Sequence, residues 1–148
     1  MKMRTHGSAR TAGFTLVELM VSIVVATILI TIAVPSYTNQ IRKSRRTDAR
    51  AAVLDLAQRE ERYMSTNGLY TTNPQNLGYG GATFPVTLGD NFYTLTVAVT
   101  AATATTPAAY TVTATPINGQ LNDSPCQSFT VNNLGVQAST PSTTCWTN

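Results

Sequence analysis

A run of 21 almost wholly apolar residues, Phe14 to Val34, lies within the stretch GFTLVELMVSIVVATILITIAVP. About 20 such residues are enough for a helix to cross a bilayer, so the run predicts a membrane-spanning helix. A cleaved secretory signal peptide has a shorter apolar region, of about 7–15 residues. Thr31 and Ala33 could still mimic the small residues of a cleavage site, so this alternative stays open.

Glu18 is the one formal charge in the apolar run. An ionised group in hydrocarbon costs roughly 2.5 kcal/mol or more, so it needs a partner from outside the run. If residues 1–13 were a leader removed just before Phe14, a new α-amino group would arise about one helical turn from Glu18. Between two staggered copies of the helix, the carboxylate of one could pair with the amine of the other and fix their register. The short basic leader also predicts a cytoplasmic N-terminus, although residues 42–46 place basic side chains on the other flank.

The charge distribution along the chain is uneven. All ten Lys and Arg residues lie in the first 62 positions, whereas residues 63–148 contain only Asp90 and Asp123 as charged residues. Nucleic-acid phosphates are bound mainly by Lys and Arg, which the second half of the chain lacks, so nucleic acid is not expected as a partner. No aromatic residue interleaves with the basic residues at 42–50, which favours a solvated helix face beside anionic lipid headgroups over a nucleic-acid site.

The remaining pattern predicts an α+β fold. Pro35 is expected to break or kink the first helix, and helical periodicity resumes over residues 36–66, with apolar residues at spacings of three, four and seven or eight. Gly, Pro and Asn residues then indicate a long irregular loop over residues 68–90. Four segments read as strands of a three- to four-stranded antiparallel meander with the long helix packed on one face: 92–99, 109–115, 127–132 and 136–139.

Two cysteines, Cys126 and Cys145, lie in the second half of the chain. In an oxidising compartment they read as one disulfide, which would add roughly 3 kcal/mol of stability. The alternative, two free buried thiols, applies if the chain stays in the cytosol. Trp146 is expected to be a core or lid residue over the disulfide, with an exposed interaction anchor as the alternative.

The residues typical of catalytic and metal sites are missing from the sequence. The single histidine, His6, lies in the leader, and Asp90 and Asp123 stand too far apart to indicate paired acid–base work. No CxxC, HExxH, P-loop or GxSxG motif occurs. Asn122, Asp123 and Ser124 could offer oxygens to Ca²⁺, but they are better interpreted as a turn. We expect no enzyme activity, no cofactor and no metal.

The start of the chain resembles a known export signal. Gly13-Phe14-Thr15-Leu16-Val17-Glu18-Leu19, after a basic leader and before an apolar run, is similar to the class III signal of type IV pilins, and the match continues through Met20 and through Ala33-Val34-Pro35-Ser36-Tyr37. The end of the chain, from Cys126 to Trp146, looks like the minor pilins of the type IVa system. The resemblance implies the pilin fold.

The resemblance also implies roles for individual residues. A prepilin peptidase would cut between Gly13 and Phe14 and N-methylate Phe14, and Glu18 would pair with the Phe14 amine of a neighbouring subunit during assembly. Pro35 would mark a region where family helices lose regular structure inside the filament. Many major pilins carry Gly where this chain has Thr27, which weakens the expectation of a melted stretch.

These implications divide the chain into four parts: a cleaved leader (1–13), a transmembrane and filament-core helix (14–35), an amphipathic helix half (36–66), and a loop, sheet and disulfide region (67–148). The implied function is that of a structural, minor subunit of a type IV pilus that serves adhesion, twitching motility or DNA uptake. The alternatives are a competence pilin that binds DNA and a pseudopilin of a type II secretion system.

The resemblance further implies partners and a location. The expected partners are other pilin subunits through the N-terminal helix, the prepilin peptidase, the inner-membrane assembly platform and the membrane itself. Before assembly the chain would be a single-pass inner-membrane protein with its C-terminal part in the periplasm. After assembly it would belong to an extracellular fibre.

Overall fold

The computed structural model describes residues 13–147. Of the predicted leader, only Gly13 falls within the described residues. One helix, α1 (Leu16–Asn67), accounts for 52 residues. Contacts divide the chain into two compact units, one up to Asn39 and one from Gln40 onward. We call the described part of the first unit the stem and the second unit the head.

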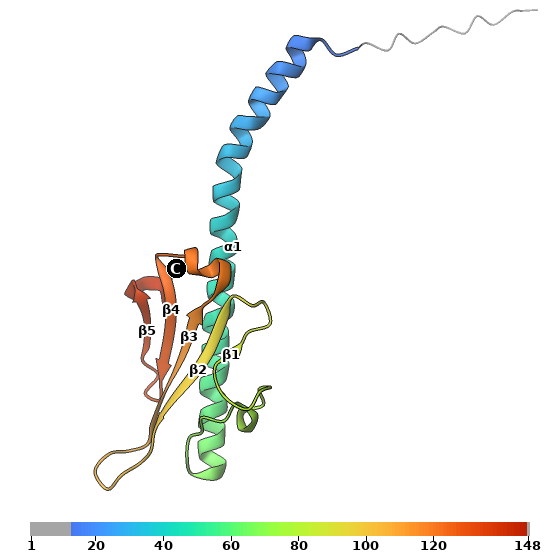
Figure 1. Cartoon of the computed structure of the whole chain (residues 1–148). Coiled ribbons are helices and arrows are strands. Elements are labelled where there is room, and N and C mark those ends of the chain that lie inside the picture. The colour runs from blue at the N-terminus through green and yellow to red at the C-terminus, as the bar shows by residue number, and fades with distance from the viewer. Residues whose placement is uncertain (1–12, 148) are drawn as a thin grey trace, which may run out of the picture. The chain divides into compact units, whose positions relative to one another are not determined.

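A five-stranded antiparallel sheet follows α1 in the head, with its strands in the order β1-β2-β3-β4-β5 (Figure 1). Its strands are β1 (Val86–Thr87), β2 (Tyr93–Thr100), β3 (Ala109–Pro116), β4 (Cys126–Asn132) and β5 (Gln137–Pro141). The predicted α+β meander is confirmed. β1 was not predicted. It lies within residues 68–90, which were expected to be irregular, and its two residues are too few to show alternation, although they pair with β2.

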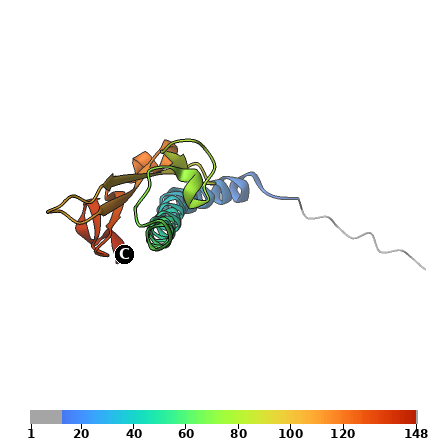
Figure 2. The same ribbon diagram turned by 90° about the horizontal axis from the view of Figure 1, so that it is seen from below.

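Alternation along the strands puts one face of the sheet against the head part of α1, as the view from below shows (Figure 2). Pairing registers align buried residues across β2, β3 and β4 in two rows: Leu95–Ala114–Phe129 and Val97–Val112–Val131. Val53 and Leu56 of α1 join these rows in one core and are fully buried. The core therefore forms between a single helix and a single sheet face.

Pro35 does not interrupt the helix, so the predicted break is absent from this structure. A proline removes only one helical hydrogen bond, and α1 continues on both sides of it. Threonine hydroxyls on the neighbouring turns bond to carbonyls of the same helix. The Thr27 hydroxyl donates to the Ile23 carbonyl at 2.8 Å, and the Thr31 hydroxyl donates to the Thr27 carbonyl at 2.8 Å. Thr38 donates in the same way to the carbonyl of Pro35 at 2.9 Å.

Residues 68–85 connect α1 to β1, and we call them the αβ loop. The short 3₁₀ helix η1 (Pro74–Leu77) lies within it and is capped at both ends. The side chain of Asn73 accepts a hydrogen bond from the Gln75 backbone at 3.0 Å. Gly78 follows with φ 77°, a left-handed conformation that glycine adopts without strain.

Candidate functional site

The stem presents an apolar surface that stays uncovered by the residues the structure describes. Its 18 most apolar consecutive residues have a mean hydropathy of 2.6, and none is buried. Phe14, at its start, is 81% exposed, and Ile32, near its end, is 70% exposed. A surface of this size and composition requires lipid or other protein to cover it.

Glu18 stands in the first turn of α1 and has a local role that the sequence interpretation missed. Its backbone N–H donates to the Thr15 hydroxyl at 3.2 Å, so Thr15 caps the helix. The signal was present as Thr-x-x-Glu, the pattern of a capping box. A carboxylate in the first turn also interacts favourably with the helix dipole. Gly13, Phe14 and Glu18 thus lie in succession where the helix begins.

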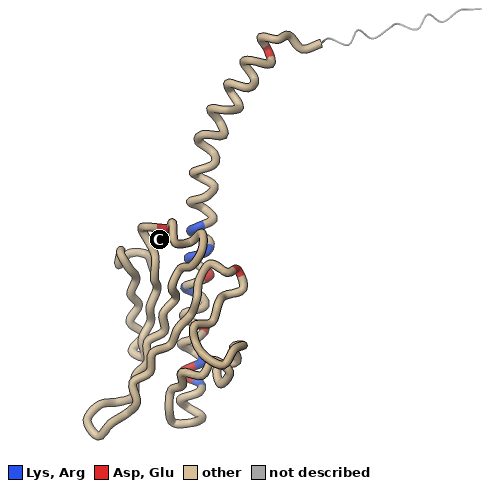
Figure 3. Tube along the Cα trace, in the orientation of Figure 1, with Lys and Arg blue, Asp and Glu red and all other residues tan. Residues whose placement is uncertain are grey.

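Most charged residues of the head lie on α1, and the five strands carry none (Figure 3). The solvated face expected for residues 42–50 is wrong for three of its arginines, each of which contacts the rest of the head. Arg45 lies over the ring of Phe92, with 3.3 Å from its guanidinium carbon to the ring centroid. Arg46 and Arg50 reach the C-terminal third of the chain. These cations hold the helix on the sheet instead of facing lipid.

Arg46 and Asp123 form a buried, two-pronged ion pair. Arg46 Nε donates to Asp123 Oδ2 at 2.6 Å, and Nη2 donates to Oδ1 at 2.5 Å. Arg46 is 8% exposed and Asp123 is 1% exposed. The hydrogen bond to Asp123 raises the pKa of the Arg46 guanidinium above its ordinary value. Gln120 donates to the same carboxylate at 2.8 Å and to the Tyr93 hydroxyl at 3.2 Å.

The sequence contained a partial signal for this pair. Arg46 continues the buried stripe of α1 at helical spacing, since it precedes Ala49 and Val53 by three and seven positions. Asp123, interpreted as a turn residue, gave no indication of its partner 77 positions away.

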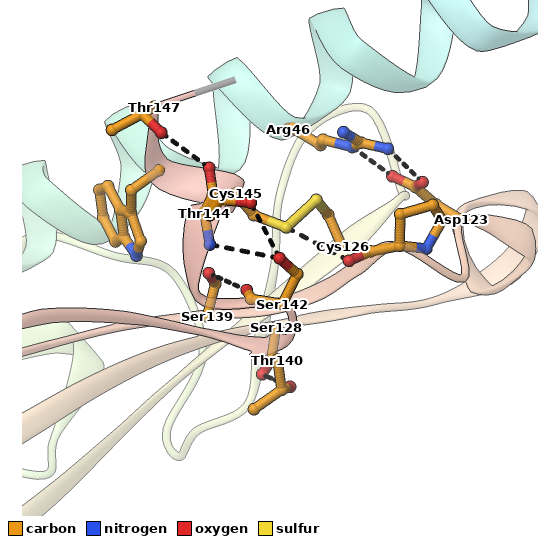
Figure 4. Close-up of a disulfide and its surroundings, with 12 residues drawn as sticks. Arg46, Asp123, Cys126, Ser128, Ser139, Thr140, Ser142, Thr144, Cys145 and Thr147 are labelled. Atoms are coloured by element: carbon orange, nitrogen blue, oxygen red, sulfur yellow. Dashed lines mark hydrogen bonds and ion pairs between the residues drawn. A yellow bond between two sulfur atoms is a disulfide. The ribbon is translucent and has the colours of Figure 1, made fainter.

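A disulfide between Cys126 and Cys145 closes the C-terminal region beside this ion pair (Figure 4). Arg50 holds the turn that carries Cys145, because its Nη1 donates to the carbonyls of Cys145 at 3.4 Å and of Trp146 at 2.6 Å. The ring of Trp146 packs edge-on against Phe129, with 5.8 Å between ring centroids, and its N–H donates to Ala138 at 2.7 Å. Helix, disulfide and last turn therefore form one contact network.

Glu60 is a buried carboxyl that the sequence interpretation did not single out. It is 0% exposed, its Oε2 accepts a hydrogen bond from the Thr71 backbone at 3.1 Å, and its Oε1 has no partner within residues 13–147. Burial raises the pKa of Glu60 above its usual range, with a further contribution from Glu61, while the Thr71 bond opposes the shift. Glu60 thus connects the αβ loop to α1 through its hydrogen bond with Thr71, and its burial disfavours the charged form of its carboxyl.

We expect Glu60→Gln to stabilise the head at neutral pH. A raised pKa means that the folded state binds the proton more tightly, so the stability that protonation confers is full below about pH 4.5 and is lost as the pH rises. A neutral amide keeps the acceptor for Thr71 without a charge, and the expected gain at pH 7.5 is about 1–3 kcal/mol. Thermal unfolding of the detergent-solubilised chain from pH 4 to 8 measures it, with the exposed Asp48→Asn as control. Equal pH profiles for wild type and Glu60→Gln would contradict this role of Glu60.

Within residues 13–147 no three His, Cys, Asp or Glu side chains are grouped so that they could hold a metal ion. Two ion pairs of the head involve arginines of α1. Arg46 pairs with the buried carboxylate of Asp123, and Arg59 pairs with Asp55, one helical turn earlier on α1.

Comparison with known proteins identifies two family patterns in the chain. The model described as "Type IV minor pilin ComP, DNA uptake sequence receptor" matches residues 35–130, and the one described as "Prokaryotic N-terminal methylation motif" matches residues 8–34. No curated protein matches the chain. Among solved structures, a type IV pilin from Shewanella oneidensis is 28% identical, covers 72% of this chain and 99% of its own, and has a TM-score of 0.47.

Proposed function

The chain belongs to the family described as type IV minor pilin ComP, DNA uptake sequence receptor, and we propose that it serves DNA uptake by binding double-stranded DNA through its head. It is a minor subunit of a type IV pilus, anchored in a membrane and then associated with the pilus. The family match over residues 35–130 is the observation that carries the DNA-binding role, because these residues include most of the head and all seven of its Lys and Arg residues. This choice reverses the expectation that nucleic acid is no partner.

The charges of the head limit how it can hold DNA. Of the seven Lys and Arg residues from 42 to 62, four contact a carboxylate, a carbonyl or a ring, which leaves Arg42, Lys43 and Arg62 without such a contact in the described residues. Each phosphate contact contributes about −0.9 to the slope of log affinity against log salt. Even if every one of these three cations contacted a phosphate, the slope would be no steeper than about −2.7, so this value is an upper bound. We therefore propose binding in which amide and hydroxyl contacts matter more than phosphate neutralisation.

A gel shift tests the proposed DNA binding. Detergent-solubilised full chain and a labelled DNA duplex would be mixed at 50, 100 and 200 mM salt. We expect a shifted complex at all three concentrations and a shallow loss of affinity. Absence of any complex at 50 mM salt would overturn the DNA-binding role and leave a structural subunit that serves adhesion or motility.

We further propose that the leader is removed between Gly13 and Phe14, that Phe14 is N-methylated, and that the new amine of one subunit pairs with Glu18 of its neighbour. The motif match over residues 8–34 supports this proposal, as does the exposure of Phe14 at the start of α1. Before assembly, the head would lie in the periplasm and the stem in the inner membrane. The prepilin peptidase and the assembly platform are the proposed partners at that stage.

Gly13→Ser is expected to block processing. A Cβ at position 13 would meet no atom of the described residues within 4 Å, so the expected effect arises in the peptidase and not in the fold of this part of the chain. The measurement is the intact mass of the chain purified from piliated cells, which should retain the 13-residue leader. A mass equal to that of the processed wild type would refute the assignment of the cleavage site.

A further inference from the structure

A pocket of about 300 Å³ opens between the last turns of α1 and the αβ loop. Its lining includes Arg59, Arg62, Tyr63, Thr66, Asn76 and Gly78. Two arginines therefore line one cavity. Residues 63–148 contribute no Lys or Arg to the head, so this pocket concentrates two of its few cations.

Arg59 is fixed in place at one wall of the pocket. Its Nε donates to Asp55 Oδ2 at 2.7 Å, its Nη1 donates to the Leu77 carbonyl at 2.9 Å, and its guanidinium carbon lies 5.0 Å from the centre of the Tyr79 ring. Gly78 permits this placement, because a Cβ there would lie only 2.8 Å from Nη1. The glycine thus makes room for the cation beside the loop backbone.

Arg62 lies one turn further along α1 and is exposed. Within the described residues its guanidinium makes no ion pair and no hydrogen bond. Its positive charge also acts on Asp55, the ion-pair partner of Arg59. Burial of Asp55 by itself would raise the pKa of its carboxyl. Hydrogen bonds from Arg59 and Tyr79, together with the charges of Arg59 and Arg62, outweigh burial and lower that pKa below its usual value. Arg62 is therefore the cation of the pocket that remains available to a ligand.

Arg59, Arg62 and Asp55 together carry a formal charge of +1. A phosphodiester carries one negative charge and accepts hydrogen bonds from a guanidinium in two-pronged geometry. Gln75 is exposed on η1 beside the pocket, and amide side chains of this kind read base edges. Charge and hydrogen-bonding groups thus match a nucleic-acid backbone at this position.

We propose that this pocket binds a phosphodiester group of double-stranded DNA, with Arg62 as the contacting cation and Arg59 as the fixed second wall. The inference rests on the proposed DNA-binding function and names the place on the head where the backbone is held. The Arg62 guanidinium contacts the phosphate oxygens, and Gln75 lies next to the adjoining base pairs.

The test compares Arg62→Gln with the matched control Lys43→Gln in the full, detergent-solubilised chain. Both variants remove one exposed positive charge, and both should keep the wild-type thermal midpoint. Arg62→Gln should weaken binding of a labelled duplex roughly tenfold and make the salt slope shallower by about 0.9, whereas Lys43→Gln should stay within about twofold of wild type. Equal losses in the two variants would overturn the inference in favour of non-specific attraction.

A second arm separates the pocket from the function. Inorganic phosphate would be titrated into the ¹⁵N-labelled chain while the amide signals of Asn76 and Gly78 are followed, and these should move in wild type and not in Arg62→Gln. If wild type binds duplex DNA and Arg62→Gln binds it equally well, the pocket assignment falls and the function stands. If phosphate moves the signals but no duplex binds, DNA is not the ligand and both proposals fall. Binding of phosphatidylglycerol vesicles that depends on Arg62, with no such dependence for DNA, would likewise overturn the inference.

Discussion

Arg46→Ala should cost about 3–5 kcal/mol of unfolding free energy. The reason is the partner left behind. Asp123 is 1% exposed and would remain charged inside the head without the two hydrogen bonds that Arg46 now donates to it. The remaining donor, Gln120, is neutral and offers one bond at 2.8 Å.

Chemical unfolding of the detergent-solubilised chain, followed by tryptophan fluorescence, would measure this loss, because Trp146 packs in the same region. Arg42→Ala is the matched control: it removes an arginine four positions earlier that makes no ion pair in the part of the chain described, and it should cost less than about 1 kcal/mol. Replacing both partners, Arg46→Met with Asp123→Leu, should recover most of the stability, because no buried charge is left unpaired. A loss below about 1 kcal/mol for Arg46→Ala would show that the pair does not hold the helix on the sheet.

Glu18→Ala should leave leader removal intact and lower recovery of the chain in pili by roughly tenfold or more. A charged group in hydrocarbon costs at least about 2.5 kcal/mol, and relief of that cost by pairing in the fibre exceeds the 1.4 kcal/mol that corresponds to a factor of ten. The alanine variant keeps the apolar surface of the stem and the Thr15 cap, since that cap binds the backbone of residue 18. It therefore remains in the membrane without the polar contact that favours assembly.

Ser22→Ala is the control for this experiment. It removes a hydroxyl that donates only to the Glu18 backbone carbonyl, at 2.7 Å on the same helix, and should leave recovery unchanged. Quantitation of processed chain in sheared pili and in the membrane fraction gives the result. Normal recovery of Glu18→Ala in the fibres would contradict the proposed pairing with a neighbouring amine.

The elements of the fold could be predicted because each has a local signal. The apolar run, the helical stripe of α1 and the alternation around Leu95 and Val112 all arise from residues near one another in sequence. The expected break at Pro35 is absent because a local rule against proline in helices does not weigh the helical turns on both sides of it. β1 escaped because its pairing with β2, and not its two residues, makes it a strand.

The contacts of the head could not be predicted in the same way. Arg46 with Asp123 and Arg50 with the carbonyl of Trp146 join positions 77 and 96 residues apart, and only the packed sheet brings them together. A basic cluster in the sequence therefore looked like a solvated face, although three of its side chains are held by the head. The same limit applies to the pocket at Arg62, which exists only because the αβ loop folds back on α1 at Gly78.

Retention of a labelled DNA duplex should be compared on sheared pili from cells that carry or lack this chain. Because the chain is proposed to have both a place in the fibre and a DNA-binding head, pili that contain it should retain the duplex. Pili without it should lose that retention at equal amounts of the major subunit. Equal retention by both preparations would contradict a DNA-binding role of this chain in the fibre.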